Sequence, residues 1–357
     1  MTAQTKRLAV FGAGLIGREH VDLIAAHPDC TLVALCDPDP ESATYAQAHG
    51  AAHFKTYESM FDRVRPDGVI IALPNQLHEA GACACLARDI PCLIEKPIAD
   101  TLEAAWRITR AAEQSSAPVL IGHQRRHSPD IRKAKHLIET GALGPLVAVN
   151  GMTLFDKPDD YFNALWRTKA GGGVLLINLI HDMDALRYLV GEIESISALT
   201  SSATRGFEVE DTAGLVIRFQ NGVIGTFIIS DCAVSPWAWE YTSGQALYHP
   251  SQPGACLFLT GRKAALSVSD LYLWRHQAPH EHWQHPLVRE HHAPEPTRTY
   301  VNQLEHFLAV IAGTTPPLIT ARDGLMSLAA TLAVARAGQT QSTVHIADLL
   351  AETEARA

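Results

Sequence analysis

Short apolar runs alternate with amphipathic stretches over the first third of the chain. The runs LAVFG, TLVALCD, GVIIALP, PCLIEKP and PVLIG begin at residues 8, 31, 68, 91 and 118, and the stretches between them cover residues 15–26, 41–49, 76–88 and 101–115. Apolar strands separated by helices of about 10 to 15 residues predict βαβ units. Because these strands are almost entirely apolar, we expect a doubly wound parallel sheet with helices on both faces.

The pattern changes after residue 122. A helical stretch at 130–140 and a polar loop at 156–169 come first, and a second helical pattern follows at 175–190. Alternating runs without intervening helices come next, among them GLVIRFQ, VIGTFIIS, CLFLTG and LYLWRH. This order predicts an α/β (α+β) domain with a large, mostly antiparallel sheet. Two late helices, at 300–312 and 322–337, are expected to dock on the domains rather than form a third.

Length and charge narrow the classes of protein. A chain of 357 residues with 47% hydrophobic residues predicts two domains, which we divide at 1–124 and 125–357. Lys and Arg number 29 against 38 Asp and Glu, and there is no basic block, so nucleic acid is not an expected partner. No apolar run approaches about 20 residues, and the first is interrupted by Gly12 and Gly14, so neither a membrane span nor a signal peptide is expected.

Cysteine and histidine patterns do not favour a metal or disulfide framework. The seven cysteines are scattered and form no Cys-x-x-Cys pair, which is typical of reduced thiols in a cytoplasmic protein. A histidine cluster raises the question of zinc, but prolines within it favour a loop, and we predict no metal. Its members are His276, His280, His282, His285, His291 and His292.

A glycine pattern follows the first predicted strand and opens the first helix, which is where a phosphate-binding turn is required. Gly12 permits the tight turn, Gly14 allows backbone to approach a pyrophosphate, and Gly17 allows close helix packing, with Leu15 and Ile16 between them. The second strand ends at Asp37, about 20 residues beyond Gly17, where a carboxylate can bind the adenosine ribose hydroxyls. That carboxylate repels a 2′-phosphate and no arginine follows it, so we predict a Rossmann domain that binds NAD rather than NADP.

The turn Glu95-Lys96-Pro97 lies at the carboxyl end of the fourth apolar run. Open α/β sheets bind ligands at this edge, so Lys96 is expected near the nicotinamide. Its ammonium can hydrogen-bond a substrate hydroxyl and stabilise the alkoxide that forms as hydride leaves. The alternative is a surface lysine in a loop.

With these motifs in place, the sequence resembles the Gfo/Idh/MocA oxidoreductase family, named for glucose-fructose oxidoreductase and inositol dehydrogenase. The resemblance covers nearly the whole chain and depends on five segments in order. They are GAGLIG near the start, ALPNQLH at 72–78, EKP at 95–97, IGHQRRHSP at 121–129 and AGGGVLLINLIHDMDALRYLVG at 170–191.

The resemblance implies roles for individual residues. Lys96 matches the family's catalytic lysine, and the peptide bond before Pro97 is expected to be cis. In the family, a loop covers the nicotinamide half of the cofactor, and this loop is matched here by Leu73, Pro74, Asn75 and His78. A second family segment, near the nicotinamide and the substrate, is matched by Gln124 and Arg125. The resemblance also implies an open C-terminal sheet that often mediates homodimers or homotetramers.

The helix predicted at 175–190 carries a candidate acid or base. His181 lies off the apolar stripe, with Asn178 one turn before it and Asp184 one turn after. An imidazole can carry the hydroxyl proton in either direction, whereas a packed or capping histidine is the alternative. In the family a histidine here contributes to acid or base catalysis, but the aspartate that many members carry four residues earlier is Ile177. We therefore predict Lys96 and His181 as the working pair, with Asn178 and Asp184 as orienting groups.

Aromatic and cationic side chains suggest a substrate pocket. Tyr161, Trp166, Arg167 and Lys169 lie in the loop at 156–169, and Trp237 follows a later strand. Aromatic faces beside polar groups suit a polyhydroxylated ring, although the tryptophans can equally fill an interface.

Three arginines, Arg125, Arg126 and Arg167, leave open an acidic sugar or another carboxylate substrate. Each can equally pair with a structural carboxylate, and the sequence does not separate the two cases.

The main hypothesis is a cytoplasmic NAD-dependent dehydrogenase that acts on a secondary alcohol of a sugar, polyol or sugar-derived acid. Lys96, Asn178 and His181 are expected to contact this substrate, together with the aromatic and arginine side chains named above. Two alternatives remain: a reductase of a keto-sugar or other small carbonyl compound, and a regulator that binds NAD(H) without turnover. Lys96 and His181 argue against the regulator, whereas Ile177 leaves it open.

Overall fold

The computed structural model describes residues 5–246, 248–279 and 282–356, which form two compact units. The first unit comprises residues 1–124, 300–326 and 352–357, and the second comprises residues 125–299 and 327–351. The sequence-based division placed the two late segments of the first unit in 125–357 and let the C-terminal helices pack back. Each unit is described by itself below.

A parallel sheet forms the centre of the first unit. Its strand order is β3-β2-β1-β4-β5-β6, and each pairing is parallel. The predicted doubly wound sheet is therefore confirmed, although the short strand β3 was not predicted because its three residues carry no continuous apolar run. The strands are β1 (Lys6–Phe11), β2 (Cys30–Cys36), β3 (Ala52–Phe54), β4 (Gly68–Ile71), β5 (Cys92–Glu95) and β6 (Val119–Gly122).

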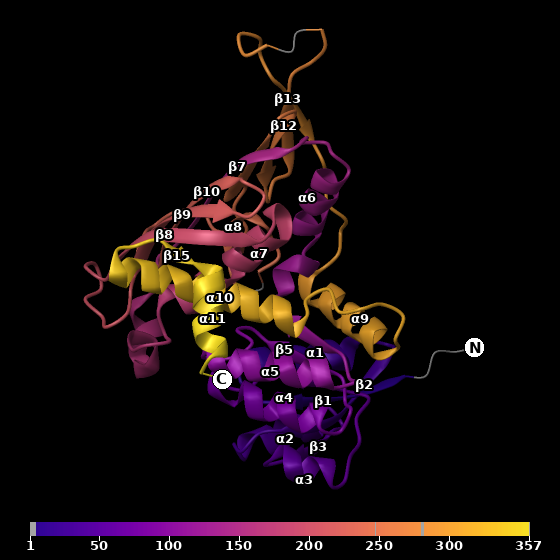
Figure 1. Cartoon of the computed structure of the whole chain (residues 1–357). Helices are drawn as coiled ribbons and strands as arrows, with labels where there is room; N and C mark the ends of the chain where they lie inside the picture. Colours follow the sequence, from indigo (N-terminus) through magenta and orange to yellow (C-terminus); the bar gives the residue numbers. More distant parts are fainter. Residues whose placement is uncertain (1–4, 247, 280–281, 357) are drawn as a thin grey trace. The chain divides into compact units, whose positions relative to one another are not determined.

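Helices follow the strands of this sheet as the apolar periodicity indicates. The α4 and α5 helices lie side by side on the first unit (Figure 1). The side chain of Thr101 caps α5 by accepting a hydrogen bond from the Ala104 N–H at 3.2 Å. The elements are α1 (Leu15–Ala26), α2 (Glu41–Ala48), α3 (Tyr57–Phe61), the 3₁₀ turn η1 (Asn75–Leu77), α4 (His78–Leu86), α5 (Leu102–Gln114) and α9 (Thr299–Ile311).

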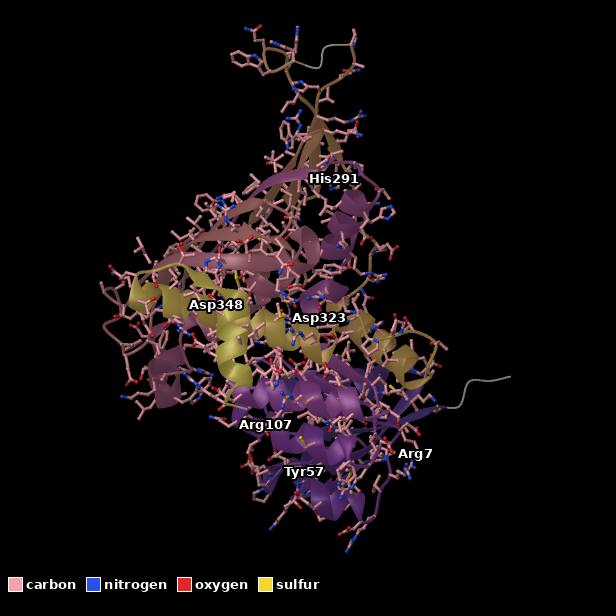
Figure 2. The ribbon with its side chains drawn as sticks, viewed as in Figure 1. Arg7, Tyr57, Arg107, His291, Asp323 and Asp348 are labelled. Atoms are coloured by element: carbon pink, nitrogen blue, oxygen red, sulfur yellow. The ribbon has the colours of Figure 1, made fainter. Side chains whose placement is uncertain are left out.

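A late helix completes the core of the first unit. Phe307 of α9 is fully buried, and a Cβ added at Gly68 of β4 would lie 3.1 Å from its ring and 2.5 Å from Ile311. On the sheet, the ring of Phe11 stacks on Tyr57 at 5.2 Å between centroids, and Tyr57 is labelled in Figure 2. The N-terminal sheet therefore buries apolar side chains from a segment about 240 residues later than the strand they contact.

A nine-stranded sheet dominates the second unit. Its order is β14-β13-β12-β11-β7-β10-β9-β8-β15, in which β7 and β10 pair in parallel and the other pairs are antiparallel. The predicted mostly antiparallel sheet is confirmed. The strands are β7 (Leu146–Leu154), β8 (Ile193–Ser201), β9 (Thr212–Phe219), β10 (Ile224–Ser230), β11 (Leu257–Gly261), β12 (Ala264–Val268), β13 (Tyr272–Arg275), β14 (Val288–His291) and β15 (Val344–His345).

The two faces of this sheet differ in burial. On β9, Leu215 and Ile217 are buried while Val216 between them is 53% exposed. Cross-strand partners share a face, so Val216 shares the outer face with Leu199 and Ile228, which are 71% and 43% exposed. The sheet therefore has an inner face that packs and an outer face that leaves large apolar side chains exposed.

Helices of the second unit surround the segment with the candidate acid–base residues. α6 packs against α7, and α8 is a four-residue helix between β10 and β11, where none was expected. α11 is a third late helix, which the sequence analysis did not predict. The elements are the 3₁₀ turns η2 (Gln124–His127), η3 (Asp159–Asn163) and η4 (Leu165–Thr168), the π-helical turn η5 (Leu175–Leu179), and the helices α6 (Pro129–Glu139), α7 (Ile180–Val190), α8 (Trp239–Thr242), α10 (Ala321–Thr340) and α11 (Ile346–Glu354).

Across the part of the chain that the structure describes, no helix combines the length and the apolar character needed to span a bilayer.

Candidate functional site

Close backbone approaches shape the turn between β1 and α1. Gly12 has a φ of +92°, and a Cβ there would lie 2.3 Å from the Ala72 carbonyl oxygen. A Cβ at Gly17 would lie 2.0 Å from the Gly12 carbonyl oxygen. At Gly14, by contrast, a Cβ would meet nothing within 4 Å, and the neighbouring Leu15 is 67% exposed. The turn is packed on its inner side and open on its outer side, as an approaching pyrophosphate requires.

Asp37 holds this turn from the end of β2. One carboxylate oxygen accepts a hydrogen bond from the Ala13 N–H at 2.6 Å, and the other accepts one from the Asp39 N–H at 2.8 Å. A carboxylate offers about four acceptor positions, so Asp37 retains capacity for ligand hydroxyls. The side chain predicted to bind ribose therefore also fixes the backbone predicted to bind the pyrophosphate.

His78 connects two loops at the carboxyl edge of the first sheet. Its Nδ1 lies 2.9 Å from the Pro97 carbonyl oxygen and its Nε2 lies 2.8 Å from the Leu73 carbonyl oxygen. Burial lowers the pKa of His78 even though these carbonyls oppose the shift. The structure thus joins Leu73 and Pro97 through His78, with Pro74 and Asn75 in the same loop.

The predicted lysine follows a buried carboxylate at the end of β5. The Lys96–Pro97 peptide bond is cis, as the resemblance implied. Glu95 lies 2.8 Å from His20 Nε2 through one oxygen and accepts the Lys96 N–H at 3.2 Å through the other. Burial alone would raise the pKa of Glu95, but the His20 hydrogen bond and the charges of His20 and Lys96 lower it overall. Glu95 is therefore an ionised buried group that orients the backbone of Lys96.

Gln124 ends the first unit with an unsatisfied acceptor. The residue is 8% exposed, and its Oε1 has no hydrogen-bond partner among the described residues. Buried amide oxygens are normally paired, so this atom is a point at which a ligand donor would be favourable.

The predicted helix at 175–190 begins with a π-helical turn, which the apolar spacing did not indicate. η5 covers Leu175–Leu179, and α7 continues from Ile180. Gly173 before it leaves no room for a side chain, since a Cβ there would lie 2.2 Å from an oxygen of Glu210. Glu210 accepts the Leu175 N–H at 3.2 Å. Single π turns occur frequently at functional sites, and this one carries Asn178 and leads to His181, which is 8% exposed.

The two predicted orienting groups have partners outside this segment. Asp184 accepts a bidentate pair from Arg126, at 2.9 Å from Nε and 2.8 Å from Nη2, and a bond from Ser327 at 2.8 Å. Asn178 accepts a hydrogen bond from Lys157 Nζ at 2.8 Å. An orienting role toward His181 stays a prediction for both residues.

Arg125, predicted to bind substrate, lies in a buried ion pair. Its guanidinium contacts Asp182 at 2.5 Å and Glu240 at 2.8 Å, and it stacks 4.8 Å from the Trp239 ring centroid. Burial raises the pKa of Asp182 to about 6, against the opposing charge of Arg125. The Arg125 guanidinium is buried, and an unpaired buried guanidinium would be costly, so it needs a carboxylate partner.

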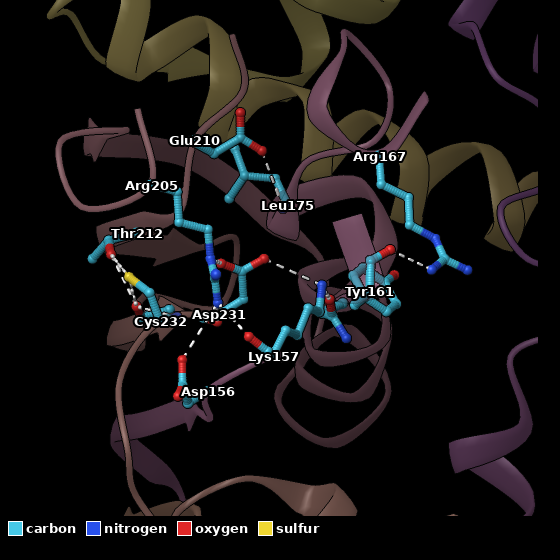
Figure 3. Close-up of polar contacts among 12 residues, drawn as sticks. Asp156, Lys157, Tyr161, Arg167, Leu175, Arg205, Glu210, Thr212, Asp231 and Cys232 are labelled. Atoms are coloured by element: carbon cyan, nitrogen blue, oxygen red, sulfur yellow. Dashed lines mark hydrogen bonds and ion pairs between the residues drawn. The ribbon is translucent and has the colours of Figure 1, made fainter. Parts of the chain in front are cut away.

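A second buried cation, Lys157, was not predicted from the sequence (Figure 3). Its side chain is 10% exposed, and its Nζ lies 3.3 Å from Asp231 Oδ2 in addition to the Asn178 contact. Burial lowers the pKa of Lys157 although Asp231 opposes the shift. Arg205 also donates to Asp231, from Nε at 2.9 Å. The Asp231 carboxylate therefore pairs with both Lys157 and Arg205, and Lys157 also contacts Asn178 in the π turn.

The polar loop at 156–169 places Arg167 against Tyr161. The Arg167 guanidinium lies 3.9 Å from the Tyr161 ring centroid and donates to the Tyr161 carbonyl oxygen at 2.6 Å. Trp166 and Trp237 are 57% and 50% exposed, so neither is a core residue of the second unit. Lys169 is exposed and pairs with Glu208 at 3.2 Å.

Lys157, Asp231 and Arg205 are the candidate residues that sequence reasoning missed. Lys157 lies in the polar loop already singled out, and Asp231 directly follows the run VIGTFIIS, so position at a strand end was the available signal. Among residues 5–246, 248–279 and 282–356, no group of three His, Cys, Asp or Glu side chains is arranged to hold a metal ion, and His280 of the histidine cluster lies outside the described residues.

Comparison with known proteins matches two segments of the chain to models of protein families. Residues 6–123 match the model "Oxidoreductase family, NAD-binding Rossmann fold", and residues 131–245 match the model "GFO/IDH/MocA C-terminal domain".

Relatives carry names from sugar metabolism. The chain is 30% identical over 199 residues to the rhizopine catabolism protein MocA of Rhizobium meliloti, an alignment that covers 56% of this chain and 61% of that relative. It is 29% identical over 349 residues to the 1,5-anhydro-D-fructose reductase of Ensifer adhaerens, which covers 95% of this chain and 98% of that relative.

The fold is shared with solved structures. One is the WlbA dehydrogenase from Bordetella pertussis in complex with NADH and UDP-GlcNAcA, with a TM-score of 0.76, 23% identity, and coverage of 96% of this chain and 99% of that chain.

The residues of the first unit fit an NAD molecule. The turn at Gly14 is open where a pyrophosphate would approach, Asp37 has acceptor capacity for ribose hydroxyls, and Gln124 Oε1 is an unsatisfied acceptor. Bound there, NAD would supply a hydride acceptor at its nicotinamide ring.

Gly14 and Gly17 should respond differently to substitution by alanine. We expect Gly14→Ala to change the free energy of unfolding by no more than about 1 kcal/mol, since its Cβ meets only open space. The same change should weaken NADH binding by about tenfold or more, because the methyl group would occupy the approach of the pyrophosphate. Gly17→Ala should impair both properties, because its Cβ meets backbone. Urea unfolding and NADH fluorescence titration measure the two quantities, and unaltered NADH affinity in Gly14→Ala would contradict this assignment.

Proposed function

Because the chain belongs to the GFO/IDH/MocA family of NAD-binding oxidoreductases, we propose that it is an NAD-dependent dehydrogenase of a sugar, polyol or sugar-derived acid. Hydride passes between nicotinamide and a secondary alcohol of that substrate. The observation that carries the proposal lies within the first unit. The glycine turn after β1 and the cis Lys96–Pro97 turn after β5 both follow strands of one parallel sheet, at the edge where such sheets bind nucleotides.

Lys96 is proposed to bind the reacting hydroxyl. An ammonium beside the hydroxyl favours its ionised form and stabilises the developing alkoxide. The ionised carboxylate of Glu95, held by His20, accepts the Lys96 N–H and so orders the backbone that carries this side chain. His78 holds Pro97 from the other side through its carbonyl. Lys96 is thus supported at both neighbours.

His181 is proposed to take the hydroxyl proton during oxidation and return it during reduction. An imidazole near neutral pH can work in either direction. Asn178, three residues earlier, is engaged by Lys157 and lacks a titratable group, so it is assigned an orienting role with Asp184. Ile177 excludes a carboxylate at the position where many family members have one, which leaves His181 as the proton acceptor.

The second candidate function is the reverse reaction, reduction of a keto-sugar or other small carbonyl compound. It is supported by the full-length similarity to a 1,5-anhydro-D-fructose reductase. The same groups then deliver a proton while hydride returns to a carbonyl carbon. A regulator that binds NAD(H) without turnover is the third, and only Ile177 favours it.

Two further properties belong to the proposal. The buried thiols, such as Cys36 with a pKa raised to about 12 by burial, and the absence of any disulfide among the seven cysteines support a cytoplasmic location. The exposed outer face of the second sheet, which includes Leu199, Val216 and Ile228, supports a homodimer or homotetramer.

Substitution of Lys96 or His181 should remove turnover but preserve cofactor binding. We expect Lys96→Met and His181→Ala to lower the rate of NAD⁺ reduction by about a hundredfold to ten-thousandfold, since each removes a proton-transfer or alkoxide-stabilising group. NADH affinity should stay within about threefold of the wild type, because neither residue contacts the pyrophosphate turn. The assay is absorbance at the NADH band with a panel of inositols, aldoses, glycosides and sugar acids. Near-normal turnover in either variant would remove that residue from the mechanism.

The cofactor preference should follow Asp37. We expect NADH to bind about tenfold or more tightly than NADPH, because the carboxylate repels a 2′-phosphate and no arginine follows it. Fluorescence titration with both nucleotides measures the ratio. Equal or tighter NADPH binding would show that the preference is assigned wrongly.

The oligomer should depend on the outer sheet face. Val216→Glu places a charge among exposed apolar side chains and should shift the mass measured by light scattering toward the monomer. Leu165→Glu is the matched control, since Leu165 is 75% exposed in the η4 turn and not on the sheet. A wild-type protein that is already monomeric at assay concentration would overturn the oligomer proposal.

A further inference from the structure

Buried contacts separate three arginines that the sequence left equivalent. Arg125 is paired with Asp182 and Glu240, and Arg126 is paired with Asp184. Arg167 pairs with no carboxylate of the described residues. Within the described part of the chain, its one acceptor is the Tyr161 carbonyl oxygen, which takes a hydrogen bond from Nη1. Arg167 is therefore the arginine of this group that retains an uncompensated charge.

The Nε edge of Arg167 has no acceptor among the described residues, and it is the edge that other guanidinium groups in this chain use to bind carboxylates. Nε and Nη2 of Arg126 bind Asp184 at 2.9 and 2.8 Å, and the same two atoms of Arg187 bind Glu192 at 3.0 and 2.7 Å. Arg107, labelled in Figure 2, binds Glu79 in the same way at 2.6 and 2.8 Å. In Arg167 the Nε is buried and has no acceptor among the described residues. A buried guanidinium N–H without an acceptor is costly unless a ligand supplies one.

The surroundings of Arg167 add positive charge. Lys157 Nζ lies 4.8 Å from the centroid of the same Tyr161 ring, and its contacts with Asn178 and Asp231 use two of its three N–H donors. Asp231 is shared with Arg205, whose other carboxylate contacts, Asp156 at 3.4 Å and Asp159 at 3.9 Å, are exposed. The three cations around Tyr161 and Asp231 thus face one buried carboxylate, Asp231, and two exposed ones (Figure 3).

The loop also leaves Arg167 accessible. Trp166 beside it is 57% exposed, with its ring centroid 5.4 Å from the Arg167 guanidinium, and Leu165 is 75% exposed. An aromatic face next to a cation can contact the C–H face of a sugar while the guanidinium binds a charged substituent.

We propose that Arg167 binds an oxyanion on the substrate through its Nε edge, with Lys157 adding positive charge, so that this protein prefers anionic sugars over neutral ones. The inference rests on the proposed function and narrows its substrate class. A carboxylate and a phosphate monoester present the same oxyanion edge to a guanidinium, so both are tested.

The experiment measures binding to the NADH-saturated protein by calorimetry at constant ionic strength. The probes are D-glucuronate and D-galacturonate against D-glucose and D-galactose, and D-glucose 6-phosphate against D-glucose. We expect at least one anionic sugar to bind about 10- to 100-fold more tightly than its neutral parent, the range of a charge-assisted bidentate contact. A uronate preference would assign a carboxylate substrate, and a preference for the sugar phosphate alone would assign a phosphate.

Variants test whether Arg167 is responsible for the preference for anionic sugars. Arg167→Gln should remove this preference and leave the affinity for the neutral sugar within about threefold, and Arg167→Lys should keep part of it because the charge remains without the bidentate fork. Lys263→Gln is the matched control, since it removes an exposed cation of the second unit in the turn between β11 and β12. It should leave the preference unaltered. If Arg167→Gln does not fold, the wild-type and Arg167→Lys measurements still decide the question.

Two results would overturn the inference. One is a wild-type protein that binds no anionic sugar of the panel more tightly than its neutral parent. The other is an Arg167→Gln variant that weakens neutral and anionic sugars equally, which would show a structural role.

A turnover assay with the same sugars separates this inference from the proposed function. NAD⁺ reduction with neutral sugars but no anion preference would refute the inference alone. Anion binding through Arg167 without turnover in either direction would refute the dehydrogenase and reductase proposals and leave the anion site established.

Discussion

The pairing of buried charge around α7 is the constraint on which the second unit depends. His181, Asp182, Asp184 and Arg187 are all buried on this one helix, where an ion without a partner would be expensive. Each carboxylate has its arginine: Asp182 has Arg125 and Asp184 has Arg126. These contacts tie α7 to the segment that follows β6. A helix so fixed can hold His181 in one position.

The same constraint explains which cations are structural and which are available for function. Arg125 and Arg126 neutralise α7, and Arg205 shares Asp231 with Lys157. Arg167 lies outside this network, stacked on Tyr161, and its buried Nε–H has no acceptor in the residues that the structure describes. In the first unit the glycine turn is fixed by backbone contacts rather than by ion pairs. Gly12 and Gly17 pack against carbonyl oxygens, and of the three glycines of this turn it is Gly14 that faces open space.

Features that depend on local pattern were predictable from the sequence, and features that depend on distant pairing were not. The parallel sheet, the glycine turn, Asp37 and the Lys96–Pro97 turn follow from strand runs and short motifs. The strand β3 and the helix α11 were missed because three and nine residues give little periodic signal. The Lys157–Asn178 contact joins residues 21 apart, and the Arg125–Asp182 contact joins residues 57 apart, so neither leaves a local trace. The π turn was missed because its apolar residues also suit an ordinary helix.

The central claim is that hydride moves directly between substrate carbon and the nicotinamide, with Lys96 and His181 handling the proton. The most direct test uses the best substrate of the panel with deuterium on every carbon, and mass spectrometry of the NADH formed. We predict that each NADH carries one deuterium at the nicotinamide ring and that its formation is slowed by the isotope. NADH that forms without deuterium, or a protein that binds NADH and gives no transfer in either direction, would contradict the account.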